Sequence, residues 1–119
     1  MCSDAQADAA IEAFGDRFLS RIFTEAEKEY CRKQNRPAVH FAARWSAKEA
    51  TSKALGTGIG ELLSWGDMEV VRRQSGEPEM VLSGDGLEFC SQHGIDQIKV
   101  SLTHAKHYAA ANAVALTTS

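Results

Sequence analysis

The chain lacks the features that would place it among membrane, secreted or disulfide-stapled proteins. No stretch approaches the roughly 18 consecutive apolar residues of a membrane-spanning helix. Residues 1–16 contain no lysine or arginine, whereas a secretion signal begins with a basic segment. Cysteine occurs only at positions 2, 31 and 90, an odd number at wide spacing that favours free thiols over a disulfide framework or a zinc site. We therefore expect a cytoplasmic protein with no membrane segment.

The composition that remains is that of an ordinary globular domain. Hydrophobic residues make up 44% and charged residues 24% of the 119 positions, which excludes disordered, collagen-like and coiled-coil chains. A chain of this length buries roughly two thirds of its unfolded surface, so it can form a core of its own. We expect residues 1–119 to form a single domain.

The net charge of −3 conceals a basic middle segment. Nine of the thirteen lysines and arginines lie in residues 17–60, whereas residues 1–16 and 61–119 are both acidic. A basic segment on an acidic protein favours a local anionic partner, such as a phosphorylated cofactor or an acidic protein. It argues against nucleic acid, because domains that bind duplex DNA are usually basic overall. Composition leaves open the alternative that these charges form a solvated helical surface.

Three helices are predicted in the first half of the chain. Residues 9–23 have a helical pattern that is broken near Gly15 and Asp16, and Thr24 with Glu27 has the form of a capping box that begins a second helix. A long third helix begins at Pro37, because proline suits a first helical turn. It ends at Gly56, because glycine suits a left-handed C-cap.

The second half of the chain changes to the period of strands. Alternating side chains and turn residues predict two strand pairs with a short helix between them: strands over 68–73, 79–82, 97–103 and 108–116, and a helix over 86–93. Helices followed by strand pairs in one unbroken chain indicate an α+β fold.

The long helix places basic and acidic side chains side by side. Positions four apart share a helical face, so Arg44 and Lys48 lie in one stripe and Glu49 and Lys53 in the next. One interpretation is an ordinary helix pair between Glu49 and Lys53. The other is a site in which Glu49 binds a hard cation, the lysines bind phosphate oxygens and the following glycines admit a ligand. Magnesium suits the second interpretation, because it takes one or two protein carboxylates and completes its shell with water and phosphate oxygens.

Residues 41–60 resemble a known family. They contain Trp-x-x-Lys-Glu-Ala-x-x-Lys from position 45, followed by Gly-Thr-Gly-Ile-Gly. This resembles the signature helix and loop of the 4′-phosphopantetheinyl transferases, in particular the holo-acyl-carrier-protein synthases and the related domain of fungal fatty acid synthases. The similarity extends to residues 17–24 and to segments within 100–111. Order and spacing agree from about residue 15 to the end.

The resemblance implies a Mg²⁺-dependent transferase of fatty acid biosynthesis and lipid metabolism. Its α+β fold would be an antiparallel sheet packed against a long central helix. Such an enzyme transfers the phosphopantetheine arm of coenzyme A to a serine of apo acyl carrier protein, releasing adenosine 3′,5′-bisphosphate. Short members of the family are usually homotrimers with coenzyme A between subunits, so a homotrimer is implied as well.

The resemblance also implies a role for each matching residue. Glu49 would ligate Mg²⁺ and, with Lys48, would be catalytic. Coenzyme A would be bound by Arg44, Lys48, Lys53, Gly56, Gly58 and His104. The acyl carrier protein would be bound by Arg17, Phe18, Arg21 and Trp45. From spacing alone, Phe18 and Trp45 fit core packing equally well, and His104 fits a histidine that only satisfies backbone groups.

The start of the chain departs from the family pattern. Family members begin with a short strand that contains Gly-x-Asp, and its aspartate is the second protein ligand of the magnesium. Counting back from Phe18 reaches Met1 or Cys2 instead, and the nearest carboxylates are Asp4 and Asp8. We therefore expect the first strand to be absent, because the chain is truncated, begins at a misassigned methionine or is a degenerate copy.

Two further hypotheses stay beside the transferase. The first is a non-catalytic or truncated homologue that binds coenzyme A or the carrier protein without transfer. The second is an unrelated α+β protein in which the charges of the long helix are coincidental.

Overall fold

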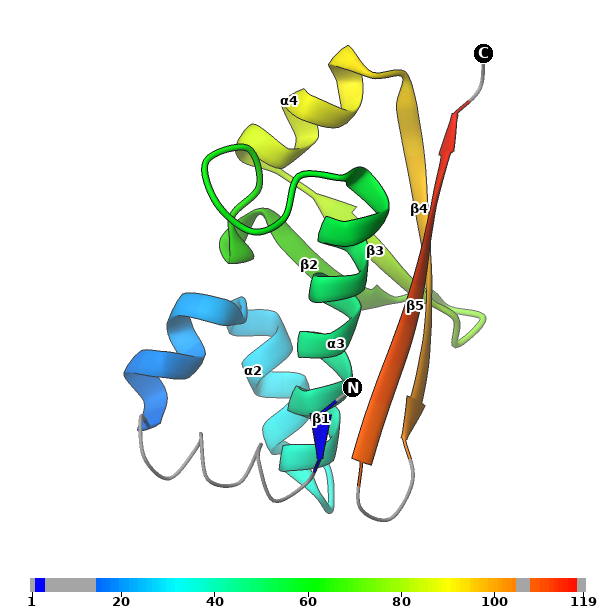
Figure 1. Cartoon of the computed structure of the whole chain (residues 1–119). Helices are drawn as coiled ribbons and strands as arrows, with labels where there is room; N and C mark the ends of the chain where they lie inside the picture. The colour runs from blue at the N-terminus through cyan, green and yellow to red at the C-terminus, as the bar shows by residue number, and fades with distance from the viewer. Residues whose placement is uncertain (1, 4–14, 105–107, 118–119) are drawn as a thin grey trace.

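The computed structural model describes residues 2–3, 15–104 and 108–117 of the chain. They form a five-stranded sheet in which every neighbouring pair is antiparallel. From one edge to the other the strands are β1 (Cys2–Ser3), β5 (Tyr108–Thr117), β4 (Ile95–His104), β3 (Pro78–Leu82) and β2 (Met68–Arg72). The predicted α+β fold, an antiparallel sheet with a long central helix packed on it, is confirmed (Figure 1).

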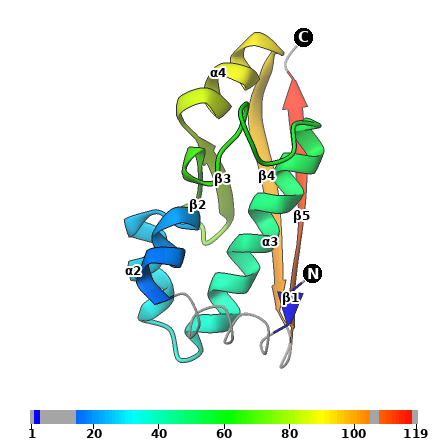
Figure 2. The same ribbon diagram turned by 60° about the vertical axis from the view of Figure 1, so that its left-hand side comes forward.

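The central helix is α3 (Pro37–Leu55), and its predicted bounds are confirmed. It begins at a proline in the first turn and ends at Gly56, whose φ of 76° is the left-handed conformation that glycine adopts without strain. The helix packs across β4 and β5, and α2 (Glu25–Arg32) lies on its other side (Figures 1 and 2). Since both sides of α3 are covered, most of its residues are buried.

The segment before α3 folds as two short helices. Residues 15–22 are helical, which confirms that part of the predicted helix; residues 9–14 lie outside the described residues. The predicted capping box at the start of α2 is confirmed: Thr24 Oγ1 accepts a hydrogen bond from the Glu27 backbone N–H at 3.2 Å, and Glu27 Oε1 accepts one from the Thr24 N–H at 2.9 Å.

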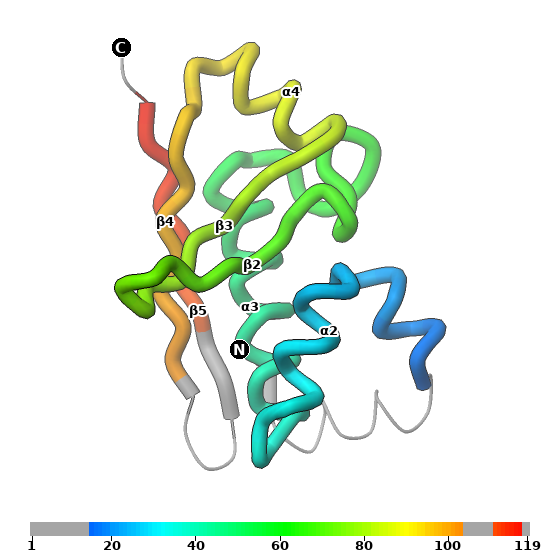
Figure 3. Tube along the Cα trace, turned by 180° about the vertical axis from the view of Figure 1, so that it is seen from behind, coloured from blue at the N-terminus to red at the C-terminus, as the bar shows by residue number. Residues whose placement is uncertain are grey.

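Strands β3 and β4 separate at one end of the sheet, whereas the other long strand pairs stay together. β4 and β5 pair along almost their whole length, and β2 and β3 pair along theirs. β3 and β4 meet at one register position, Glu79 opposite Lys99, and then diverge (Figure 3). The short helix α4 (Gly84–Gln92) joins their diverging ends and begins two residues before its predicted start.

The start of the chain differs from the sequence-based expectation of a missing first strand. Cys2 and Ser3 form a two-residue strand that pairs with β5, opposite Ala109 and Tyr108. The edge of β5 that faces away from β4 is free at this point, so an extended segment can continue the sheet there. The strand contains no Gly-x-Asp motif, and both Asp4 and Asp8 lie outside the described residues.

Two apolar clusters make up most of the core. The larger lies between α3, the sheet and α4, and its buried members are Ala47, Leu55, Leu63, Met68, Val70, Met80, Cys90, Ile98 and Val100. The other joins α3 to α2 and the 15–22 helix through Leu19, Ile22, Phe23, Cys31 and Phe41. In the described part of the chain no helix is long and apolar enough to cross a membrane.

Candidate active site

Glu49 and Lys53 lie on consecutive turns of α3 with exposed side chains. Positions four apart stack on one face of a helix, so the carboxylate and the ammonium share that face. The structure therefore brings together two of the residues that the sequence predicts for the site. An exposed carboxylate beside an exposed cation is suited to a polar, charged ligand.

The loop after α3 is open at the surface. Gly56 and Gly58 have φ values of 76° and 66°, and a Cβ at either position would meet no atom within 4 Å. The backbone N–H groups of Thr57 and Gly58 both donate to the Ser52 carbonyl, at 3.2 and 3.3 Å, which closes the end of the helix. The glycines are thus needed for backbone conformation, and they leave the surface of the loop uncovered beside Lys53.

The far end of this loop is fixed to α4. Leu63 is fully buried, and the Gly60 N–H donates to its carbonyl at 2.8 Å. Asp67 Oδ2 accepts hydrogen bonds from the N–H groups of Ser64 (3.2 Å) and Gly86 (3.1 Å). A Cβ at Gly86 would lie 2.6 Å from Leu63 Cδ1, so the loop packs this closely on α4 because glycine has no side chain.

Lys48 is the largest departure from the predicted site. Its side chain is fully buried, and its ammonium donates to Glu27 Oε1 at 2.7 Å, to the Ile22 carbonyl at 2.6 Å and to the Trp65 carbonyl at 3.4 Å. Adjacent helix residues point about 100° apart, so Lys48 faces inward where Glu49 faces outward. Burial lowers the pKa of the Lys48 ammonium, and the Glu27 carboxylate opposes that shift. The structure does not bring Lys48 to the surface where a phosphate would lie.

Arg44 also lies inside, on the side of α3 that faces α2. It is 2% exposed, its guanidinium carbon lies 4.4 Å from the centre of the Tyr30 ring, and Nη1 donates to the His40 carbonyl at 3.3 Å. Its Nε is buried without a hydrogen-bond partner among the described residues. A buried donor of a charged group is costly to leave unsatisfied, so this atom is suited to an anionic acceptor.

A basic cavity that the sequence did not predict lies between the end of α2 and the start of α3. It has a volume of about 310 Å³ and is lined by Lys33, Gln34, Asn35, Arg36, Val39 and His40. His40 is one helical turn before Arg44, so the cavity is near that guanidinium along α3. In the sequence, the basic residues before Pro37 could have indicated this cavity, but they form no recognisable motif.

The residues predicted to bind the carrier protein divide into two kinds. Arg17 and Arg21 are exposed on the 15–22 helix, four positions apart and therefore on one face. Phe18 and Trp45 are half-buried and pack against the same apolar cluster. The Trp45 ring lies 6.4 Å from the Trp65 ring, edge to face. Core packing thus accounts for much of both aromatic side chains.

The backbone of His104 ends β4 opposite Ala109, as the predicted terminal strand pair requires. The role of its side chain in coenzyme binding stays a prediction. Residues 105–107 and the two candidate carboxylates Asp4 and Asp8 lie outside the described residues.

Few carboxylates among the described residues are placed to bind a metal ion. Across residues 2–3, 15–104 and 108–117, no three histidine, cysteine, aspartate or glutamate side chains come together as a metal cage. Glu49 is an exposed single carboxylate, which fits Mg²⁺ when substrate phosphates supply further ligands. The thiols offer no alternative, because burial raises the pKa of Cys31 to about 12 and also raises that of Cys90.

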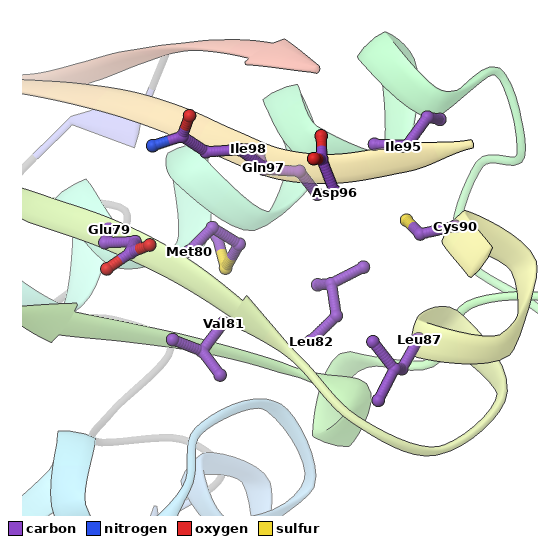
Figure 4. A pocket seen from close by; sticks show the side chains of 10 residues that line it. All are labelled: Glu79, Met80, Val81, Leu82, Leu87, Cys90, Ile95, Asp96, Gln97 and Ile98. Atoms are coloured by element: carbon purple, nitrogen blue, oxygen red, sulfur yellow. The ribbon is translucent and has the colours of Figure 1, made fainter. Parts of the chain in front are cut away.

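A second cavity lies where β3 and β4 diverge (Figure 4). It has a volume of about 220 Å³ and is lined by Glu79, Met80, Val81, Leu82, Leu87, Cys90, Ile95, Asp96, Gln97 and Ile98. Seven of these ten side chains are apolar or a thiol and three are acidic or amide, so the cavity offers no cation to a phosphate.

The chain is similar to proteins of one superfamily along most of its length. The profile of the 4′-phosphopantetheinyl transferase superfamily matches residues 4–113. A holo-[acyl-carrier-protein] synthase of Chlamydia trachomatis serovar L2 is 46% identical over 104 residues, which cover 87% of this chain and 84% of that protein. The synthase of Caldanaerobacter subterraneus subsp. tengcongensis is 46% identical over 99 residues, covering 83% and 77% of the two chains.

Solved structures give the same result for the fold. The Helicobacter pylori holo-[acyl-carrier-protein] synthase in complex with coenzyme A superposes with a TM-score of 0.84 and 28% identity, covering 96% of this chain and 94% of that one. The Bacillus anthracis synthase in complex with coenzyme A (3′,5′-ADP) has a TM-score of 0.72 and 34% identity, covering 91% and 87%. The chain therefore belongs to the 4′-phosphopantetheinyl transferase superfamily and, within it, to the holo-acyl-carrier-protein synthase type.

Proposed function

We propose that this chain transfers the 4′-phosphopantetheine group of coenzyme A to a serine of apo acyl carrier protein, with Mg²⁺ as the metal. The products are holo carrier protein and adenosine 3′,5′-bisphosphate. The observation that supports this function best is the exposed face of Glu49 and Lys53 at the end of α3, leading into the open loop that begins at Gly56.

The site would act by positioning and charge neutralisation. The serine hydroxyl of the carrier attacks the β-phosphorus of coenzyme A, and the bond to the departing adenosine 3′,5′-bisphosphate breaks. Such a step needs in-line placement and compensation of negative charge more than covalent chemistry by the protein. Mg²⁺, when bound, neutralises charge on the diphosphate. Glu49 would hold the metal, Lys53 would bind a phosphate oxygen, and the backbone at Gly56 and Gly58 would border the nucleotide.

Coenzyme A carries a further phosphate on its ribose, and the basic cavity is suited to it. Lys33 and Arg36 line that cavity, and the unpartnered Nε of Arg44 lies one turn beyond its His40 wall. His104, on the resemblance to the family, would contribute to the same nucleotide.

The carrier protein would approach the 15–22 helix. Arg17 and Arg21 are exposed on one face of it, and acyl carrier proteins would present acidic groups to them. Complementary charge of this kind sets the association rate and its salt dependence more than the final affinity. Phe18 and Trp45 would supply the exposed parts of their rings to the same surface.

We propose in addition that residues 1–119 form a single domain that assembles as a homotrimer in the cytoplasm and serves fatty acid biosynthesis. The support for assembly is a pair of exposed valines on the face of the sheet away from α3, a face that also carries Lys99 and Asn112. Met80 and Ile98 point into the core, so their alternate neighbours point to the other face. There Val81 is 45% exposed and Val114 is 54% exposed. Light scattering on the purified chain measures the oligomeric state directly.

An intact-mass assay tests the proposed function. Purified chain, coenzyme A and Mg²⁺ are incubated with an apo carrier protein, and the carrier is expected to gain the mass of phosphopantetheine. The gain should disappear with EDTA and with Glu49→Gln. Glu88→Gln is the matched control, because Glu88 is an exposed carboxylate on α4, and it should leave the gain unchanged.

The same assay separates the proposal from a non-catalytic homologue. No mass gain by the unaltered chain, together with calorimetric binding of coenzyme A, would contradict the transferase and leave a binding protein. A gain that Asp4→Asn abolishes and Asp8→Asn does not would identify the second carboxylate, and the reverse pattern would assign Asp8.

A further inference from the structure

We infer that the buried ion pair of Lys48 and Glu27 positions Glu49 for metal binding, and that Lys48 does not itself contact the substrate. This inference rests on the proposed function, because it concerns the same site. It assigns Glu27, which the sequence motif does not include, a part in the reaction.

The first observation is that the three acceptors of the Lys48 ammonium among the described residues belong to three different segments. The ammonium bonds to the Ile22 carbonyl at the end of the 15–22 helix, to Glu27 on α2 and to the Trp65 carbonyl in η1 (Trp65–Asp67). One side chain of α3 thus joins three segments that lie on its α2 side. The rotation and height of α3 are fixed against all three at this one residue.

The second observation is that Glu27 is fully engaged in the same network. Its Oε1 accepts from the Thr24 N–H at 2.9 Å and from Lys48 at 2.7 Å, and its Oε2 accepts from the Val70 N–H of β2 at 2.8 Å. Both side chains of the pair are 0% exposed. A substrate therefore cannot reach either charge without displacing the core.

The third step is energetic. Replacing a buried ion pair by well-packed hydrophobic groups of similar size is often neutral for stability, because the pair costs so much desolvation. A pair that adds little stability can still fix a register between segments. Here the pair fixes how α3 is rotated at Lys48. Because Glu49 is the next residue, that rotation also fixes the direction of its side chain.

The test compares one double variant with its two parts. Glu27→Gln/Lys48→Met keeps the size of both side chains and removes both charges. Lys28→Met is the matched control: Lys28 is also a buried lysine, but its ammonium bonds to Ser20 (2.6 Å) and Glu25 (2.8 Å), on the 15–22 helix and α2. Transfer kinetics, thermal melting and calorimetric binding of coenzyme A with and without Mg²⁺ are measured for each.

We expect the double variant to fold but to melt lower than the unaltered chain, because a glutamine at position 27 can accept from only one of the Thr24 and Val70 N–H groups. Below its melting temperature it should lose about 10- to 100-fold in turnover, the range for groups that orient a metal ligand. Its affinity for coenzyme A measured without Mg²⁺ should stay within about twofold, because no direct phosphate contact is lost. The extra coenzyme A affinity that Mg²⁺ confers should fall by a similar 10- to 100-fold. Lys28→Met should keep turnover and the Mg²⁺ effect.

Two results would overturn the inference. Unchanged turnover and Mg²⁺ effect in the double variant would mean that the pair has no part in the site. A raised KM for coenzyme A in Lys48→Met, with Glu27→Gln unchanged, would mean that Lys48 contacts the substrate directly. If Lys48→Met alone does not fold, the double variant and Glu27→Gln decide between these results.

Failure of the proposed function gives a different pattern. If the unaltered chain transfers nothing, the transferase is contradicted and calorimetry alone decides the inference. Mg²⁺ must then raise coenzyme A affinity in the unaltered chain and not in the double variant; equal Mg²⁺ effects in the two would overturn the inference.

Discussion

Lys48 and Lys53 lie five positions apart on the same helix and have opposite surroundings. Lys48 is 0% exposed and bonds to a carboxylate and two carbonyls of other segments. Lys53 is exposed one turn beyond Glu49. The two sides of α3 therefore differ: the inner side fixes the helix to its neighbours, and the outer side exposes charged side chains to solvent. The same residue type in one motif does not imply the same role.

The largest effect that we expect is on stability and comes from the inner lysine. Lys48→Met leaves the Glu27 carboxylate buried without its partner, which should lower the free energy of unfolding by about 3–5 kcal/mol. Lys53→Met should change it by no more than about 0.5 kcal/mol, as is usual at exposed positions. Urea denaturation measures both, and equal losses in the two variants would contradict the contrast between the two sides of the helix.

The second effect is on substrate binding and comes from the outer lysine. In the proposed site Lys53→Gln would remove a charged hydrogen bond to phosphate, a contact of about 1.5–3 kcal/mol, so the KM for coenzyme A should rise about tenfold or more. Arg73→Gln is the control, because it removes an exposed cation on the hairpin between β2 and β3. If steady-state kinetics show a larger rise in KM for Arg73→Gln than for Lys53→Gln, Lys53 does not belong to the site.

The third expected effect is on stability and comes from the loop that follows α3. Gly56→Ala puts a side chain on a residue with φ of 76°, which should cost about 1–2 kcal/mol of stability. Gly60→Ala is the matched substitution in the same loop: its φ is not in the left-handed region and a Cβ there meets nothing. Thermal melting should therefore separate the two variants. A Gly60→Ala variant that melts as low as Gly56→Ala would show that conformation is not the cause.

The smallest effect concerns an ion pair outside the core. The Arg32 guanidinium beside Asp16 lowers the pKa of that carboxyl, and Lys28 lowers it further. The stabilisation is therefore present above the ordinary pKa of aspartate and is lost as the pH falls through the lowered value. In an NMR titration Arg32→Gln should raise the pKa of Asp16 toward its ordinary value. No change would mean that the exposed pair is not formed in solution.

Local signals predicted most of the elements. The capping box at Thr24, the proline at position 37 and the left-handed glycine at position 56 each have a mechanism that depends on near neighbours only. Those bounds are confirmed to within a residue. That Glu49 and Lys53 share one face follows from helix periodicity once the bounds are known.

The inner network could not be predicted in this way. α3 has buried residues all round, so its apolar pattern does not mark one face as the inside. Glu27 was identified as the second residue of a capping box, but its bond to Lys48 joins positions 21 apart in the sequence. The strand β1 is only two residues long and depends on the free edge of β5. Each of these features is decided by tertiary contacts.

The loop from Gly56 to Leu63 is tied at both ends, and this limits how it can respond to a ligand. Its first N–H groups donate to Ser52, and its last residue is buried against Gly86 of α4. The exposed side chains of Ile59 and Leu62 lie between these ties, and the Gly60 N–H is itself bonded to the Leu63 carbonyl, so the part of the loop that can move is short. A fluorophore attached at position 62 would report ligand entry, whereas one on α4 would stay silent.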